Sequence, residues 1–250
     1  MPDKRQHRGA HPEDYYLFVP EVWPRLRAAA ADLSWLLSRG YTSHSGLKAV
    51  GERYNLAERQ RMAVLRSACS DDAFARRRSH EARARSVAPL RGQAVLIDGF
   101  NVLTTIEAAL AGGVILQARD GCYRDIASMH GTFHKVKETI PAIALISEAL
   151  AALEVSECLW YLDRRVSNSG RLKKMILETM PARNATYSFP LWKVESVVDP
   201  DTILAQSTDV IATADSAILD QCQHWFSLAR EVVSRFVPGA HVIDLSYTSA

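Results

Sequence analysis

The sequence lacks the features of several common protein classes. Its four cysteines are scattered and include no C-x-x-C pair, which argues against a structural zinc site and a disulfide scaffold. No apolar run approaches the roughly 18 residues of a membrane span, and the N-terminus has no apolar secretory segment. We therefore expect a cytoplasmic protein with buried free thiols and no membrane contact.

Several catalytic motifs are also missing. The chain has no G-x-G-x-x-G, no P-loop and no G-x-S-x-G, which excludes the common dinucleotide, nucleoside triphosphate and serine hydrolase sites. The strand that would open such a fold is instead followed by Asp98-Gly99-Phe100-Asn101. An aspartyl-phosphate phosphatase would carry a second Asp at position 100, where this chain has Phe100.

Charged residues of both signs are present, but they are distributed unevenly along the chain. Residues 1–91 contain 17 Lys and Arg against 10 Asp and Glu, a net charge of +7, and the remaining residues carry 13 against 18, or −5. A basic segment before an acidic one is typical of a polyanion-binding module joined to a metal-dependent catalytic one, although two ordinary solvated surfaces give the same counts. The apolar content of 48% is enough for one or two domains.

Residues 21–88 read as helices, with two short ones flanking Asn55-Leu56 in the outline of a helix-turn-helix. Arg59 and Arg66 are seven residues apart and share a face that could contact phosphates. A denser basic run, Arg76-Arg77-Arg78 followed by Arg83 and Arg85, is either a solvated helix or linker or a guide for a nucleic-acid backbone. We expect residues 1–90 to form a basic helical domain that binds nucleic acid, and residues 91–250 a second domain.

The second segment alternates apolar strands with helical stretches, which predicts a three-layer α/β domain with a mostly parallel central sheet. A long helix is expected over residues 132–153, with a kink or break at Pro141. Asp120-Gly121 predicts a hairpin turn. The expected strands lie at 94–97, 114–117, 123–126, 158–162, 185–190, 209–214 and 241–245.

Acidic residues follow three of these strands and open one helix. Asp98, Asp163 and Asp215 end strands, and Asp201 begins a helix. Because the carboxyl ends of parallel strands meet at one edge, these side chains can converge there. Clustered carboxylates raise one another's pKa unless a cation neutralises them, and Mg²⁺ or Mn²⁺ prefers oxygen ligands. Each Asp is alternatively an ordinary helix cap, Asp201 above all.

Two of these segments carry a family resemblance. Val95 to Asn101 resembles the first motif of PIN and NYN-type ribonuclease domains, and residues 209–219 resemble their last motif. Asp201 matches the acid that begins the preceding helix. Asp163 takes the intermediate acidic position from a strand end, where many PIN domains use a Glu on a helix. The resemblance covers residues 92–245.

The whole chain also resembles an uncharacterised prokaryotic family in which a helical N-terminal domain precedes a PIN-like domain; residues 11–14 and 36–41 carry this resemblance. The PIN resemblance implies a Mg²⁺- or Mn²⁺-dependent endoribonuclease, or a related nuclease, in which Asp98, Asp163, Asp201 and Asp215 are catalytic metal ligands. RNA is then favoured over DNA as the substrate. A homodimer is also implied.

Other polar residues lie near these acids in the sequence. Asn101 could orient Asp98 or cap the next helix. Asp120 and Arg124 belong to the predicted hairpin and are more simply assigned to its turn. His130 and His134 are four apart, but structural or surface roles suit them better than metal binding. Residues that suit phosphate binding follow Asp163, although capping explains the Ser and Asn equally; they are Arg164, Arg165, Ser167, Asn168 and Ser169.

Two functional classes remain. In the first, the protein is a metal-dependent nuclease that uses the four acids and needs no side-chain nucleophile. In the second, it is a non-catalytic nucleic-acid-binding or assembly protein with a degenerate PIN-like scaffold, in which the acids serve as helix caps.

Overall fold

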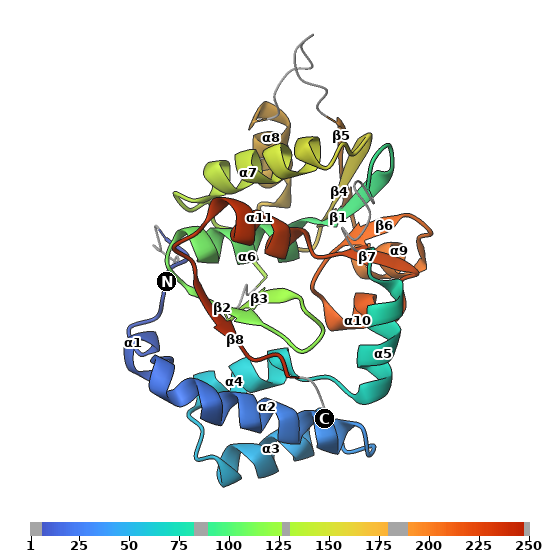
Figure 1. Cartoon of the computed structure of the whole chain (residues 1–250). Helices are drawn as coiled ribbons and strands as arrows, with labels where there is room; N and C mark the ends of the chain where they lie inside the picture. Colours follow the sequence, from blue (N-terminus) through green and yellow to red (C-terminus); the bar gives the residue numbers. More distant parts are fainter. Residues whose placement is uncertain (1–6, 83–89, 127–130, 180–189, 248–250) are drawn as a thin grey trace.

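A computed structural model describes residues 7–82, 90–126, 131–179 and 190–247 (Figure 1). An all-helical segment comes first and comprises α1 (Asp14–Leu17), η1 (Pro20–Val22), α2 (Trp23–Leu37), α3 (Ser43–Arg53), α4 (Glu58–Ser67) and α5 (Asp71–His80). The later helices are α6 (Gly99–Leu110), α7 (Thr139–Ala152), α8 (Ser169–Thr179), α9 (Pro200–Gln206), α10 (Ser216–Leu219) and α11 (Leu228–Phe236).

The central sheet has five parallel strands in the order β5-β4-β1-β6-β7. They are β1 (Ala94–Asp98), β4 (Glu157–Asp163), β5 (Leu191–Val197), β6 (Val210–Ala212) and β7 (His224–Phe226). Side chains of β1 alternate between two cores: Val95 and Ile97 pack among α6, α7, α8 and α11, while Leu96 packs with α9 and α10. Burial on both faces explains the continuous apolar run, and it confirms the predicted α/β class with a mostly parallel sheet.

A second sheet joins the helical segment to the rest of the chain. It has the order β3-β2-β8, formed by β2 (Val114–Gln117), β3 (Tyr123–Asp125) and β8 (His241–Asp244). Ile115 faces the main core, whereas Val114 and Leu116 share a core with α2, α3 and α4. The helical segment therefore packs directly on this sheet, as Figure 1 shows below β2 and β8.

Several predicted boundaries differ in the structure. The long helix over residues 132–153 is wrong, because α7 begins only at Thr139 and Pro141 lies in its first turn, where a missing N–H costs no helical hydrogen bond. Thr42 caps the start of α3 by accepting a hydrogen bond from Ser45 N–H. Most of the strand expected at 185–190 lies outside the described residues, and the observed strand β5 follows it.

The predicted phosphate-contacting arginines take part in internal ion pairs. Arg59 makes a bidentate pair with Asp14, at 2.6 and 2.8 Å. Arg66 Nη1 donates to the Asp125 carbonyl, 2.7 Å away, and lies 3.7 Å from its carboxylate. Because these groups bind protein acceptors, neither presents a free cationic face to a nucleic acid. This expectation for α4 is therefore corrected.

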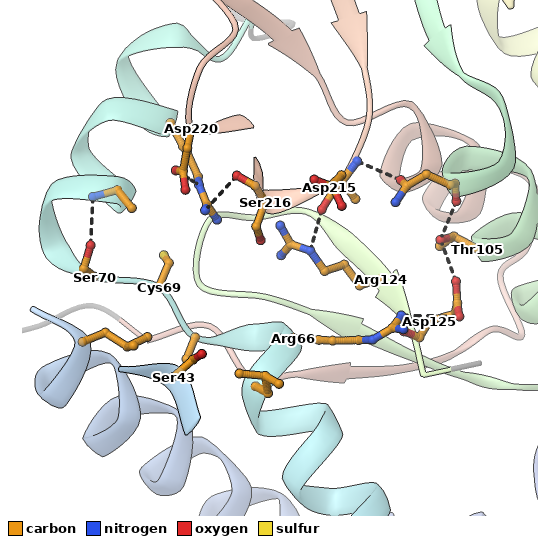
Figure 2. A pocket seen from close by; sticks show the side chains of 17 residues that line it. Ser43, Arg66, Cys69, Ser70, Thr105, Arg124, Asp125, Asp215, Ser216 and Asp220 are labelled. Carbon is orange, nitrogen blue, oxygen red and sulfur yellow. Dashed lines mark hydrogen bonds and ion pairs between the residues drawn. The ribbon is translucent and has the colours of Figure 1, made fainter. Parts of the chain in front are cut away.

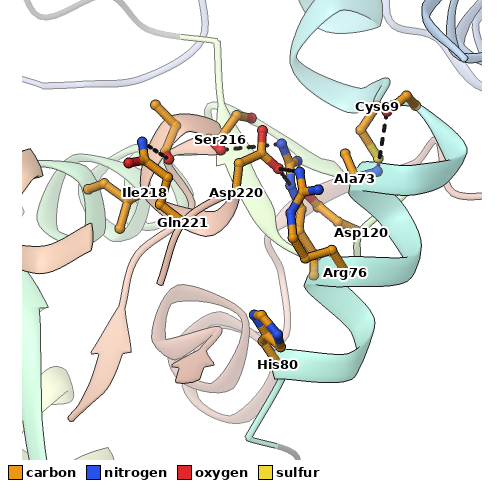
Figure 3. A network of polar contacts seen from close by, with 12 residues as sticks. Cys69, Ala73, Arg76, His80, Asp120, Ser216, Ile218, Asp220 and Gln221 are labelled. Carbon is orange, nitrogen blue, oxygen red and sulfur yellow. Dashed lines mark hydrogen bonds and ion pairs between the residues drawn. The ribbon is translucent and has the colours of Figure 1, made fainter. Parts of the chain in front are cut away.

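The basic run on α5 also holds the fold together. Arg77 is buried and donates to Asp120 and Asp220, while Arg76 contacts Asp220 from the surface (Figure 3). The Trp225 indole donates to the Arg77 carbonyl at 2.7 Å, which links the end of α5 to β7. Arg77 is thus neither a solvated linker residue nor part of a backbone guide, whereas Arg83 and Arg85 of the same run lie outside the described residues.

No helix in the described ranges is long and apolar enough to cross a membrane.

Candidate functional site at the carboxyl edge of the central sheet

Asp98 ends the central strand β1 and is half-buried. Its Oδ2 accepts a 2.7 Å hydrogen bond from the Thr213 hydroxyl, in the loop after the neighbouring strand β6. The next residue must be small: a Cβ on Gly99 would lie 2.5 Å from Leu162 Cδ2 and 2.9 Å from the Tyr161 carbonyl oxygen. The close approach of β1 and β4 thus fixes the backbone that carries Asp98.

The loop that carries Asp215 is held from three sides. Thr213 Oγ1 accepts from Asp215 N–H at 3.0 Å, so one hydroxyl bridges the two acids. Asn101 Oδ1 accepts from Ala214 N–H at 2.9 Å, and Arg124 Nε donates to the Ala214 carbonyl at 2.7 Å. Asp215 itself caps α10 through one carboxylate oxygen, Oδ1, which accepts two backbone N–H groups. Its other oxygen remains for a further partner.

Charge and burial act together on these acids. Burial raises the pKa of Asp98 to about 7, opposed by the Thr213 hydrogen bond and reinforced by the charges of Asp215 and Asp201. Burial also raises the pKa of Asp201, with contributions from Asp215, Asp199 and Asp163. The carboxylates of Asp98, Asp201 and Asp215 therefore share one electrostatic environment, and Asp163 lies at its margin.

Asp163 and the residues after it build a turn. Asp163 Oδ1 accepts from Arg165 N–H at 2.7 Å, and Arg164 N–H donates to the Val197 carbonyl. Asn168 has a positive φ of 66° and donates from its amide to the Phe133 carbonyl. The backbones of Ser167 and Ser169 also serve this turn, through Phe133, Gly131 and Val166. These contacts favour the capping interpretation of the segment over phosphate binding, while the side chains of Arg164 and Arg165 are exposed.

The acids are near neighbours but do not form a closed metal site. In the described part of the chain, no three His, Cys, Asp or Glu side chains are placed so that they could hold one metal ion. Of the two histidines considered from the sequence, His130 lies outside the described residues. His134 is half-buried.

A cavity of about 630 Å³ adjoins the acidic cluster (Figure 2). It lies where α3, α4 and α5 meet β3 and the start of α10, and Asn101 and Asp215 line it from the cluster side. Sequence reasoning missed this space, because it is enclosed by segments more than 100 residues apart. It also missed the positioning contacts of Thr213 and Arg124, although Thr213 belongs to the segment 209–219 that resembles the last PIN motif.

Comparison with known proteins identifies the family to which the chain belongs. The model "Domain of unknown function (DUF5616)" matches residues 87–231, more than half of the chain. The chain belongs to the DUF5616 family. A second model, "Protein of unknown function (DUF434)", matches residues 25–80 of this DUF5616 protein. "Uncharacterized protein MJ0935" of Methanocaldococcus jannaschii is 30% identical over 194 residues, which cover 78% of this chain and 88% of that protein. No solved structure matches significantly.

Proposed function

We propose that this protein is a metal-dependent nuclease that hydrolyses phosphodiester bonds, with RNA as the preferred substrate. The observation that carries the proposal is the shared electrostatic environment of Asp98, Asp201 and Asp215 at the carboxyl edge of a parallel sheet, where α/β proteins bind ligands. Three carboxylates that penalise one another's charge are a ligand set that a hard divalent cation would stabilise. The preference for RNA follows from the PIN and NYN resemblance of the sequence motifs.

The residues have separate roles in this proposal. Asp98, Asp201 and Asp215 would hold Mg²⁺ or Mn²⁺, and Asp163 would contribute from the margin. When bound, the cation would activate water and offset the charge that develops on the phosphodiester. Thr213 and Asn101 hold Asp98 and the Asp215 loop in place. Closing the acids on one ion requires a side-chain rotation, which the exposed Asp201 can make without disturbing the core.

A second candidate is a non-catalytic protein in which the acids stabilise turns and helix ends. The contacts of Asp215 with Ala217 and Ile218 N–H, and of Asp163 with Arg165 N–H, support it. It does not account for the position of Asp98 at the end of β1, where burial raises the pKa of its carboxyl group and the charges of Asp215 and Asp201 add to this effect. We therefore favour the nuclease.

The experiment is a Mn²⁺ titration followed by melting temperature, paired with cleavage of labelled RNA and DNA with and without EDTA. Asp98→Asn should abolish both the Mn²⁺-dependent rise in melting temperature and cleavage, because it removes the central charged ligand. Asp209→Asn is the matched control, since Asp209 is an exposed acid at the opposite end of β6. Equal Mn²⁺ stabilisation of wild type and Asp98→Asn would overturn the proposal.

A further inference from the structure

The cavity beside Asp215 has the size and position of a ligand site. Its volume of about 630 Å³ lies within the range of roughly 300–1,000 Å³ typical of small-molecule sites. Two of its lining residues, Asn101 and Asp215, also belong to the acidic site. A molecule that fills the cavity would therefore reach the edge of the proposed reaction centre (Figure 2).

Apart from Asp215, the charged side chains that line the cavity are paired with opposite charges. Arg66 pairs with Asp125, and Arg77 with Asp220; all four line the cavity. Arg124 makes a bidentate pair with Asp120 behind the wall. A phosphate would have to compete with these carboxylates for each guanidinium, so the cavity favours an uncharged ligand.

The remaining wall combines apolar and hydrogen-bonding groups. Leu37, Leu65 and Ala73 supply apolar surface, which suits the face of a flat ring. Ser43 and Ser216 add exposed hydroxyls, and Thr105 adds one that already donates to Asp125 and to the Asn101 carbonyl. A neutral molecule with one flat apolar face and several polar edges matches this wall.

We propose that the cavity binds the nucleoside part, base and ribose, of one nucleotide of the substrate strand. The identification of the ligand as part of a nucleic acid rests on the proposed nuclease function. The phosphate of the same nucleotide would then lie outside the cavity, toward Asp215 and Asp98. The helical segment supplies part of this cavity through α3, α4 and α5, so it would take part in substrate binding.

The test measures binding of adenosine, guanosine, cytidine and uridine to the intact protein in EDTA, by titration calorimetry and ligand-observed NMR. We expect saturable binding of at least one nucleoside, with inorganic phosphate unable to displace it. Ser43→Trp, at the exposed rim, should weaken binding at least tenfold by filling the cavity. His44→Trp is the control, because His44 is exposed on the same helix and does not line the cavity.

A second pair of variants on the opposite rim tests the proposal independently, in case the first pair does not fold. Ser216→Trp should also weaken binding, whereas Ala217→Trp, exposed and outside the cavity, should not. Absence of binding by all four nucleosides, displacement by phosphate, or unchanged binding by both rim variants would overturn the proposal. Binding is measured in EDTA, so it does not depend on the metal. If nucleosides bind but metal-dependent cleavage is absent, only the nuclease proposal is rejected. Asp98-dependent cleavage without nucleoside binding would reject only the cavity assignment.

Discussion

Arg77 and Asp120 form a nearly fully buried ion pair, with 2.7 Å between Nη1 and Oδ2. Arg124 binds the same carboxylate through two further contacts of 2.9 and 2.7 Å. Although burial opposes it, these guanidinium groups hold the pKa of Asp120 far below its usual range. Arg124 also donates to the Ala214 carbonyl, so one network connects α5 to the loop that carries Asp215.

Breaking this network should be costly. Arg77→Gln leaves the Asp120 and Asp220 carboxylates with one fewer cationic partner, and we expect a loss of about 3–5 kcal/mol in the free energy of unfolding. Urea denaturation measures this value. Arg78→Gln on the same helix is the comparison, because the Arg78 side chain is 38% exposed and its buried partner, Glu81, keeps an ion pair with Arg230; the loss should be smaller, about 1 kcal/mol. Similar losses in both variants would contradict the structural role of Arg77.

Two glycines should respond in opposite directions to alanine. At Gly99 the added Cβ meets backbone and side-chain atoms of β4, so Gly99→Ala should destabilise the protein by about 1–3 kcal/mol and displace Asp98. At Gly170, on the exposed side of α8, a Cβ meets no atom within 4 Å. Gly170→Ala should therefore stabilise the helix by up to about 1 kcal/mol. Thermal melts of the two variants check both signs, and a neutral Gly99→Ala would show that β1 and β4 can separate.

The raised pKa of Asp98 predicts a stability that depends on pH. The folded protein holds this proton up to a pKa of about 7, against 3.8 for an ordinary Asp, so its contribution to stability falls as pH rises between these values. In EDTA at pH 8, Asp98→Asn should therefore stabilise the protein by roughly 1–3 kcal/mol, and at pH 4 the gain should vanish. Urea denaturation at both pH values measures this difference. Asp209→Asn should show no comparable dependence, and a gain that is equal at both pH values would exclude titration of Asp98 as its cause.

Residues 91–250 should not fold stably without the helices. Removal of the N-terminal helices exposes four fully or nearly buried apolar side chains in and just after the strands of the second sheet: Val114, Leu116, Ile243 and Leu245. At about 1.5–3 kcal/mol each, the loss of roughly 6–12 kcal/mol approaches the whole stability of a typical domain. Near-ultraviolet circular dichroism of this fragment should lack tertiary signal, and co-expression with residues 1–90 should restore it. A folded fragment with native signal would show that the shared core is dispensable.

Much of the architecture follows from local patterns. The apolar runs around residues 94–97, 158–162 and 210–214 predict strands because burial on both faces excludes polar side chains. The helix that follows Pro200 and the turn at Asp120-Gly121 were equally readable from capping and turn residues. The beginning of α7 was not, since Phe133 and Val136 continue the helical spacing of Ile140 and Ile143 although they pack in the core from a loop.

Apolar runs in the sequence predict where the parallel strands end, and therefore which acids stand at one sheet edge: Asp98, Asp163 and, just beyond its strand, Asp215. How these acids interact depends on the packing of distant segments, because side-chain contacts such as that of Thr213 with Asp98 join residues 115 positions apart. The same packing determines which partners the arginines have. A run of cations in a sequence looks solvated, but whether it faces water or a buried carboxylate depends on which distant segment packs against it.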